Sequence, residues 1–114
     1  MKLLDTSAWI EFFKGSAAGA HVMSILEKEQ VYTSAITFAE IARWAQDTGV
    51  SINRVIENIK KNSVIIPLEE QILVESGRQY SKLRKIKTKM GMIDILIYFS
   101  ALIHGLDVLT TDPD

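Results

Sequence analysis

Short runs of apolar residues alternate along this chain with longer segments in which apolar residues recur every three or four positions. The short runs are rich in Leu, Ile and Val and are typical of buried β-strands. They lie at residues 2–4, 31–33, 64–66 and 107–109. The longer segments predict amphipathic helices. Strands that alternate with helices favour an α/β fold. We therefore predict a three-layer α/β/α protein with a short, mostly parallel central sheet.

Capping residues and glycines predict where the helices begin and end. The first helix starts within Asp5–Ser7 and ends at Gly15, and the last one ends at Gly105. Thr37 is followed three residues later by Glu40, a spacing that predicts a capping box at the start of the third helix. The other predicted helices cover residues 17–30, 51–61, 69–85 and 92–104.

The composition excludes several classes of protein. The chain has 114 residues, which predicts one domain over residues 1–114. It contains no cysteine, so it has no disulfides, thiolate metal ligands or cysteine nucleophile, and a cytoplasmic location is expected. No apolar run reaches the roughly 18 residues of a membrane span. There is also no glycine-rich phosphate loop and no Gly-x-Ser-x-Gly motif, and the two histidines lack metal-ligand spacing.

The basic residues are unevenly distributed although the net charge is only −1. Six of the 13 gather in one segment that contains no acid: Arg78, Lys82, Arg84, Lys85, Lys87 and Lys89. One interpretation is a solvated helix end, because cations favour a helix C-terminus. The other is a patch that contacts phosphates. Both interpretations stay open at this point.

Four acids stand beside residues that belong in a core: Asp5, Glu40, Asp94 and Asp112. An ionised carboxylate at the edge of a core needs a compensating partner, and few cations lie nearby in the sequence. Asp5 and Asp112 each follow a predicted strand, at the end where α/β sheets place their ligands. The four acids together therefore suggest one shared Mg²⁺ or Mn²⁺ ion.

Each of these acids also has an ordinary structural interpretation. Asp5 and Asp94 could each cap a helix, and Glu40 could reach back to the cap at Thr37. Asp112 could belong to a turn. Asp94 makes the strongest case for function, because the segment around it is nearly all apolar and predicts a helix that is buried on most sides.

The order and spacing of four motifs resemble the PIN-domain family, and most of all the VapC toxins of prokaryotic toxin–antitoxin pairs. The motifs are Leu-Asp-Thr-Ser-Ala-Trp, Ala-Glu-Ile-Ala, Ile-Asp-Ile-Leu-Ile-Tyr and Leu-Thr-Thr-Asp, at residues 4–9, 39–42, 93–98 and 109–112. The resemblance spans nearly the whole chain. It implies a compact α/β/α fold and a metal-dependent ribonuclease.

The resemblance also implies roles for individual residues. Asp5, Glu40, Asp94 and Asp112 correspond to the acidic quartet that binds Mg²⁺ or Mn²⁺ in the family. Ser7 and Thr110 would orient these ligands or a water molecule, and Asp114 would add outer negative charge. The basic run would follow an RNA backbone. The family implies an RNA substrate, a cognate antitoxin and a homodimer, with no membrane association.

The sequence departs from the family pattern in two places. PIN domains usually continue past the last motif into a further strand, so the C-terminal edge strand is expected to be missing or truncated here. Tyr98 and Phe99 stand where the family favours smaller residues. The alternative function is therefore a catalytically degenerate PIN-like domain that binds protein or RNA. A receiver-type or phosphatase domain is disfavoured, because it needs a second acid near Asp5 and a lysine after a late strand.

Overall fold

A parallel four-stranded sheet organises the protein. The computed structural model describes residues 1–86 and 89–112. The strands pair in the order β3-β2-β1-β4, and every pair is parallel. Their bounds are β1 Lys2–Leu4, β2 Val31–Ser34, β3 Val64–Ile66 and β4 Asp107–Leu109. The four predicted strands and the parallel sheet are confirmed.

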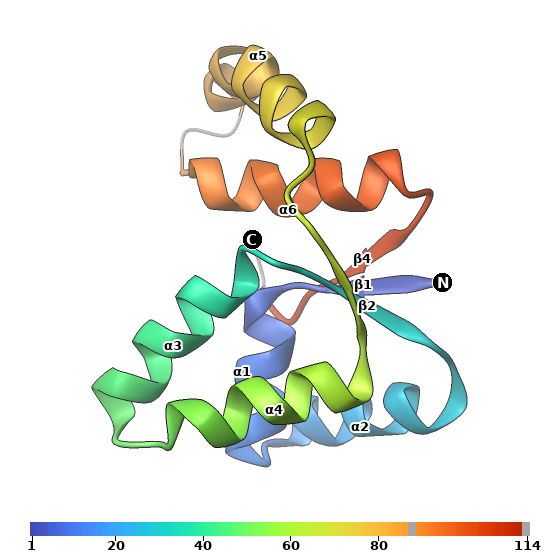
Figure 1. Cartoon of the computed structure of the whole chain (residues 1–114), viewed down its shortest axis with the longest axis vertical. Helices are drawn as coiled ribbons and strands as arrows, with labels where there is room; N and C mark the ends of the chain where they lie inside the picture. The colour runs from blue at the N-terminus through green and yellow to red at the C-terminus, as the bar shows by residue number, and fades with distance from the viewer. Residues whose placement is uncertain (87–88, 113–114) are drawn as a thin grey trace.

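Helices cover both faces of the sheet, so the three-layer prediction is also confirmed. Figure 1 shows the first four helices on one face and the last two on the other. Their bounds are α1 Thr6–Lys14, α2 Ala17–Lys28, α3 Thr37–Thr48, α4 Ile52–Asn62, α5 Glu70–Ile86 and α6 Met92–Ile103. None of the helices in the described ranges is long and apolar enough to cross a membrane.

Alternation along β1 divides the core into two clusters. Successive strand residues point to opposite faces of a sheet. Leu4 packs with α1 to α4, whereas Leu3 packs with α5 and α6, and both side chains are fully buried. Trp9 of α1 is also fully buried, and its indole Nε1 donates a hydrogen bond of 3.1 Å to Thr33 of β2. This contact holds α1 against the sheet.

Three helices begin at the same edge of the sheet. Helix α1 follows β1 directly, α3 follows β2, and α6 runs back toward the start of β4. The N-termini of these helices therefore lie at the carboxyl edge of the parallel strands. A helix N-terminus carries partial positive charge and free N–H groups, which favour carboxylates nearby. Of the predicted acids, Asp5 and Asp112 follow β1 and β4, and Glu40 and Asp94 lie in the first turns of α3 and α6, at this same edge.

Candidate functional site at the carboxyl edge of the sheet

Two neighbouring strands bring Asp5 and Asp112 together. β1 and β4 are adjacent, with Leu4 opposite Leu109. Asp5 follows β1, and its backbone N–H donates to the carbonyl of Leu109 at 3.1 Å. Asp112 lies three residues after the end of β4. Residues more than a hundred positions apart therefore meet at one edge of the sheet.

Asp5 is the N-cap of α1, as its position predicted, and it also faces the site. Its Oδ1 accepts hydrogen bonds from the Ala8 backbone N–H at 2.9 Å and from the Ser7 hydroxyl at 2.7 Å. Within the described residues, Oδ2 has no hydrogen-bond partner. The cap fixes the orientation of the carboxylate and leaves one oxygen for a ligand.

Hydroxyl groups connect the start of α1 to the segment after β4. The Ser7 and Thr110 hydroxyls lie 3.2 Å apart, and the backbone N–H of Thr111 donates to Ser7 Oγ at 3.1 Å. The backbone N–H of Asp112 donates to Thr110 Oγ1 at 3.0 Å. Ser7 and Thr110 therefore tie Asp5 to the segment that carries Asp112.

Asp94 lies in the first turn of α6 and is exposed. Its Oδ2 accepts a hydrogen bond of 3.1 Å from the backbone N–H of Gly91. Its helix was predicted to be buried on most sides, but Asp94 itself is exposed. The buried residues of α6 begin at Ile95, directly after Asp94. The charge of Asp94 therefore needs no buried partner, because the side chain is exposed and accepts one backbone hydrogen bond.

The predicted capping box at the start of α3, which would involve Glu40, is not formed. The N-cap of α3 is Ile36, Thr37 is already helical, and no side chain caps this helix. The predicted Thr37–Glu40 capping box is therefore wrong. Glu40 Oε1 instead accepts a short hydrogen bond from the hydroxyl of Thr6, 34 residues away. Sequence reasoning missed Thr6 as a partner because no local pattern links the starts of two separate helices.

Three of the four acids line one pocket of about 310 Å³. Its lining consists of Asp5, Lys89, Met90, Asp94, Ile97, Tyr98, Val108, Thr110 and Asp112. Glu40 does not line it, but its hydrogen bond with Thr6 connects it to the residue that follows Asp5. Among residues 1–86 and 89–112, no three acids or histidines lie close enough to hold an ion as they stand.

The chemistry of the donors nevertheless suits a hard divalent cation. Asp5, Glu40 and Asp94 accept hydrogen bonds from hydroxyl and backbone groups, and none forms an ion pair with a residue that the structure describes. Oxygen ligands with full negative charge are those that Mg²⁺ and Mn²⁺ prefer.

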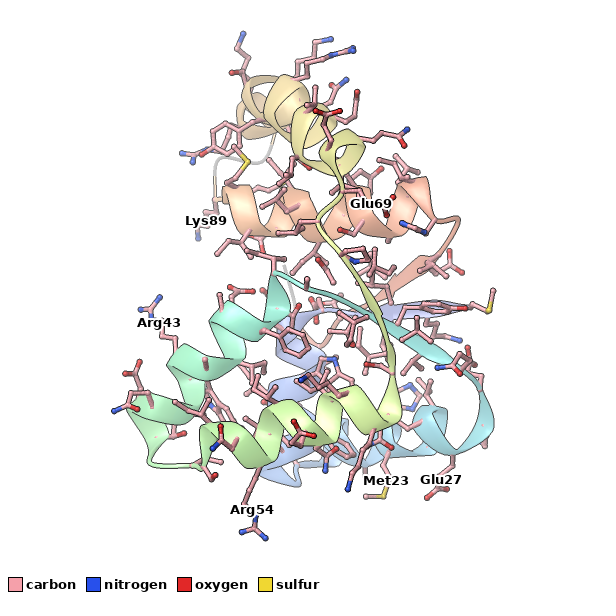
Figure 2. The ribbon with its side chains drawn as sticks, in the orientation of Figure 1. Met23, Glu27, Arg43, Arg54, Glu69 and Lys89 are labelled. Atoms are coloured by element: carbon pink, nitrogen blue, oxygen red, sulfur yellow. The ribbon has the colours of Figure 1, made fainter. Side chains whose placement is uncertain are left out.

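The predicted basic run is divided between two places. Arg78, Lys82, Arg84 and Lys85 are exposed on α5, which packs on α6 away from the sheet. Among the described residues of the run, Lys89 alone lines the acidic pocket. Figure 2 shows Lys89 near the start of α6 and Arg43 on α3, both on the same side of the molecule. Lys87 and Asp114 lie outside the described residues.

The sequence matches the model of the PIN-domain family over residues 2–114. The chain belongs to the PIN-domain family. No curated protein matches the sequence significantly. The family assignment therefore rests on the match to the family model, on the fold and on the arrangement of the acids.

Solved structures of PIN-domain toxins share the fold. A toxin–antitoxin complex from Klebsiella pneumoniae has 24% identity and a TM-score of 0.74, with 98% of this chain and 87% of that chain covered. VapC20 of Mycobacterium tuberculosis, a toxin that cleaves the sarcin–ricin loop, has 13% identity, a TM-score of 0.76 and coverage of 100% and 92%. VapBC2 of Rickettsia felis, bound to a promoter DNA fragment, has 15% identity, a TM-score of 0.75 and coverage of 97% and 87%.

Proposed function

We propose that this PIN-domain protein is a metal-dependent endoribonuclease and the toxin of a toxin–antitoxin pair. The observation that carries the proposal is the pocket lined by Asp5, Asp94 and Asp112. These acids come from three separate parts of the chain, and the fold has no structural need to gather like charges. Family membership and the likeness to VapC structures support the same assignment.

The acids would hold the metal. In this proposal Asp5, Glu40 and Asp94 bind Mg²⁺ or Mn²⁺, directly or through water, and Asp112 completes the negative pocket. A divalent cation bound there would lower the pKa of a water molecule and offset negative charge on the non-bridging phosphate oxygens. The short hydrogen bond from Thr6 holds the Glu40 carboxylate toward the Asp5 side of the site.

The remaining residues orient ligand and substrate. Ser7 holds Asp5, and Thr110 holds the backbone that carries Asp112. One carboxylate would orient the attacking water and accept its proton. As the new bond to phosphorus forms, the bond from phosphorus to the leaving oxygen on the opposite side breaks, and that oxygen takes up a proton from water. Asp114 is proposed to add outer negative charge. Lys89 and the cations of α5, with Lys87, would contact the RNA backbone.

The partners follow from the same assignment. Structures similar to this chain include toxin–antitoxin complexes. We therefore include a cognate antitoxin, a homodimeric state and a cytoplasmic location in the proposal. Co-expression with the product of a neighbouring small reading frame would test the first, and light scattering of the purified protein would test the second.

Replacement of Asp94 by asparagine tests the enzymatic proposal. Asp94→Asn keeps a side-chain oxygen that can accept from Gly91 but removes the charge. We expect RNA cleavage in Mg²⁺ buffer to be lost while the circular dichroism melt is retained. Asp107→Asn is the matched control, because Asp107 is exposed on β4 but does not line the pocket. Cleavage by Asp94→Asn at the wild-type rate would overturn the proposal.

One observation favours the alternative of a catalytically degenerate domain. In the described part of the chain, no three acids are close enough to share an ion without movement. A metal titration separates the two functions, because a ligand that binds only the folded state raises thermal stability. A nuclease should show a shift with Mg²⁺ or Mn²⁺ that Asp5→Asn removes. A degenerate binding module should show no shift in either protein.

A further inference from the structure

Two chemically different sets of residues line the pocket. One set carries the carboxylates of Asp5, Asp94 and Asp112. The other set, the apolar wall, consists of Met90, Ile97, Tyr98 and Val108. A site that handled only a metal ion and a phosphate would have no use for the apolar wall. Its composition points to a substrate group that is flat or apolar and lies next to the phosphate.

Tyr98 is the most prominent residue of the apolar wall. Its side chain is 45% exposed, whereas its helix neighbours Ile97 and Phe99 are 5% and 7% exposed. Its ring meets Phe99 edge to face, with the centroids 5.1 Å apart. No described residue forms a hydrogen bond with its hydroxyl. Unlike Leu102, which is also exposed on α6, Tyr98 lines the pocket, so its exposed ring is available to a ligand there.

The position of Tyr98 connects the apolar wall to the acids. Tyr98 lies four residues after Asp94 on α6, and side chains at this spacing are neighbours on one helix face. Val108, 38% exposed, extends the wall on the adjacent strand β4. Lys89 lies on the rim and supplies a cation. Acid, cation and aromatic ring are thus within the reach of a single nucleotide.

We infer that Tyr98 and the apolar wall form a nucleobase-binding subsite for single-stranded RNA, beside the phosphate that the acids would cleave. This inference rests on the proposed ribonuclease function. Bases of single strands stack on aromatic side chains, whereas bases inside a duplex cannot present their faces. The pocket volume of about 310 Å³ is at the lower end of the range for small-ligand sites, which suits one base.

The test uses short single-stranded RNAs in which one nucleotide at a time is abasic. Binding is measured by fluorescence anisotropy in Mg²⁺, with the Asp94→Asn variant as parent so that the RNA stays intact. We expect one abasic position to weaken binding by about tenfold, the effect of one lost stacking contact. Adding Tyr98→Ala should weaken binding of the intact RNA by a similar factor and abolish the dependence on that position. Tyr98→Phe should restore both.

Leu102→Ala is the matched control. Leu102 lies one turn further along α6 and is 56% exposed, but it does not line the pocket. It should leave both measurements unchanged. Thermal melts of all variants check folding. If wild-type protein cleaves RNA but Tyr98→Ala behaves like Leu102→Ala, the subsite is overturned and the nuclease assignment survives.

Two further results would also overturn the inference. If Tyr98→Ala changes only the oligomeric state in light scattering, a second copy of the chain covers this face instead of RNA. If the wild-type protein neither binds nor cleaves RNA in Mg²⁺ or Mn²⁺, the proposed function itself fails and the subsite fails with it. The cleavage assay on the wild-type protein distinguishes these failures.

Discussion

Glu29 at the amino edge of the sheet and the acids Asp5, Glu40 and Asp94 at the carboxyl edge have different partners. At the amino edge, Glu29 forms an ion pair of 3.1 Å with Lys2, which starts β1. At the carboxyl edge, Asp5, Glu40 and Asp94 receive hydrogen bonds only from hydroxyl and backbone groups of the described residues. A cation therefore neutralises Glu29, whereas neutral donors orient Asp5, Glu40 and Asp94.

This difference explains how one fold can carry both a structural acid and a candidate metal site. A cation beside a carboxylate offsets its charge, so little attraction remains for a ligand. Neutral donors fix the direction of a carboxylate and leave its charge available. The N-termini of α1, α3 and α6 add partial positive charge that lowers the cost of holding the acids together.

The largest expected effect comes from removing one charge at the carboxyl edge. Asp5→Asn keeps an N-cap of equal quality, so the fold should be retained. We expect cleavage to fall by more than about 100-fold, because a metal ligand supplies several kcal/mol to the transition state. Cleavage assays and melts with and without Mg²⁺ provide the measurement. A metal-dependent melting shift equal to that of the wild type would contradict the comparison of the two edges.

The next effect comes from removing a neutral donor. Thr6→Val deletes the hydroxyl that donates to Glu40 but keeps a β-branched side chain. Hydrogen bonds to charged groups contribute roughly 1.5–3 kcal/mol, and misorientation of Glu40 should cost cleavage about tenfold or more. Thr6→Ser should restore the rate. Equal loss in Thr6→Ser and Thr6→Val would mean that packing, and not the hydroxyl, is responsible.

A smaller effect is expected for the cation at the pocket rim. Lys89→Gln should weaken RNA binding by a few fold and lower the slope of log K against log salt by about 0.7, the value for one contact with a single strand. Lys60→Gln on the exposed face of α4 should change neither quantity. Titrations at several salt concentrations give both numbers. An unchanged slope would place the RNA away from this rim.

The smallest effect is expected at the amino edge. Glu29→Gln breaks the ion pair with Lys2, and both side chains are 35% exposed. Ion pairs at such sites contribute about 0–1 kcal/mol, so the free energy of unfolding should fall by no more than that. Cleavage should be unaffected. Urea denaturation and the cleavage assay check the two parts, and a loss of activity would show that the edges are coupled.

Local patterns predicted the elements well because their causes are local. Apolar runs predicted all four strands, and the N-caps Asp5, Ser16 and Ser51 precede helices as such residues commonly do. The exception is Thr37, whose capping-box pattern with Glu40 is not formed. There the Glu40 carboxylate accepts a hydrogen bond from the distant residue Thr6 instead of from the start of its own helix.

The sequence by itself determined the strands, the helices, the family and the four acids, since each depends on residue type and spacing along the chain. The tertiary structure decided which groups meet, because contacts between distant segments depend on strand order and helix direction. It brought Asp5, Asp94 and Asp112 to one pocket and left Asp94 exposed. It also placed Glu40 within hydrogen-bond distance of Thr6. It also placed Tyr98, a helix neighbour of Asp94, in the same pocket as Asp5 and Asp112, which no spacing in the sequence had predicted.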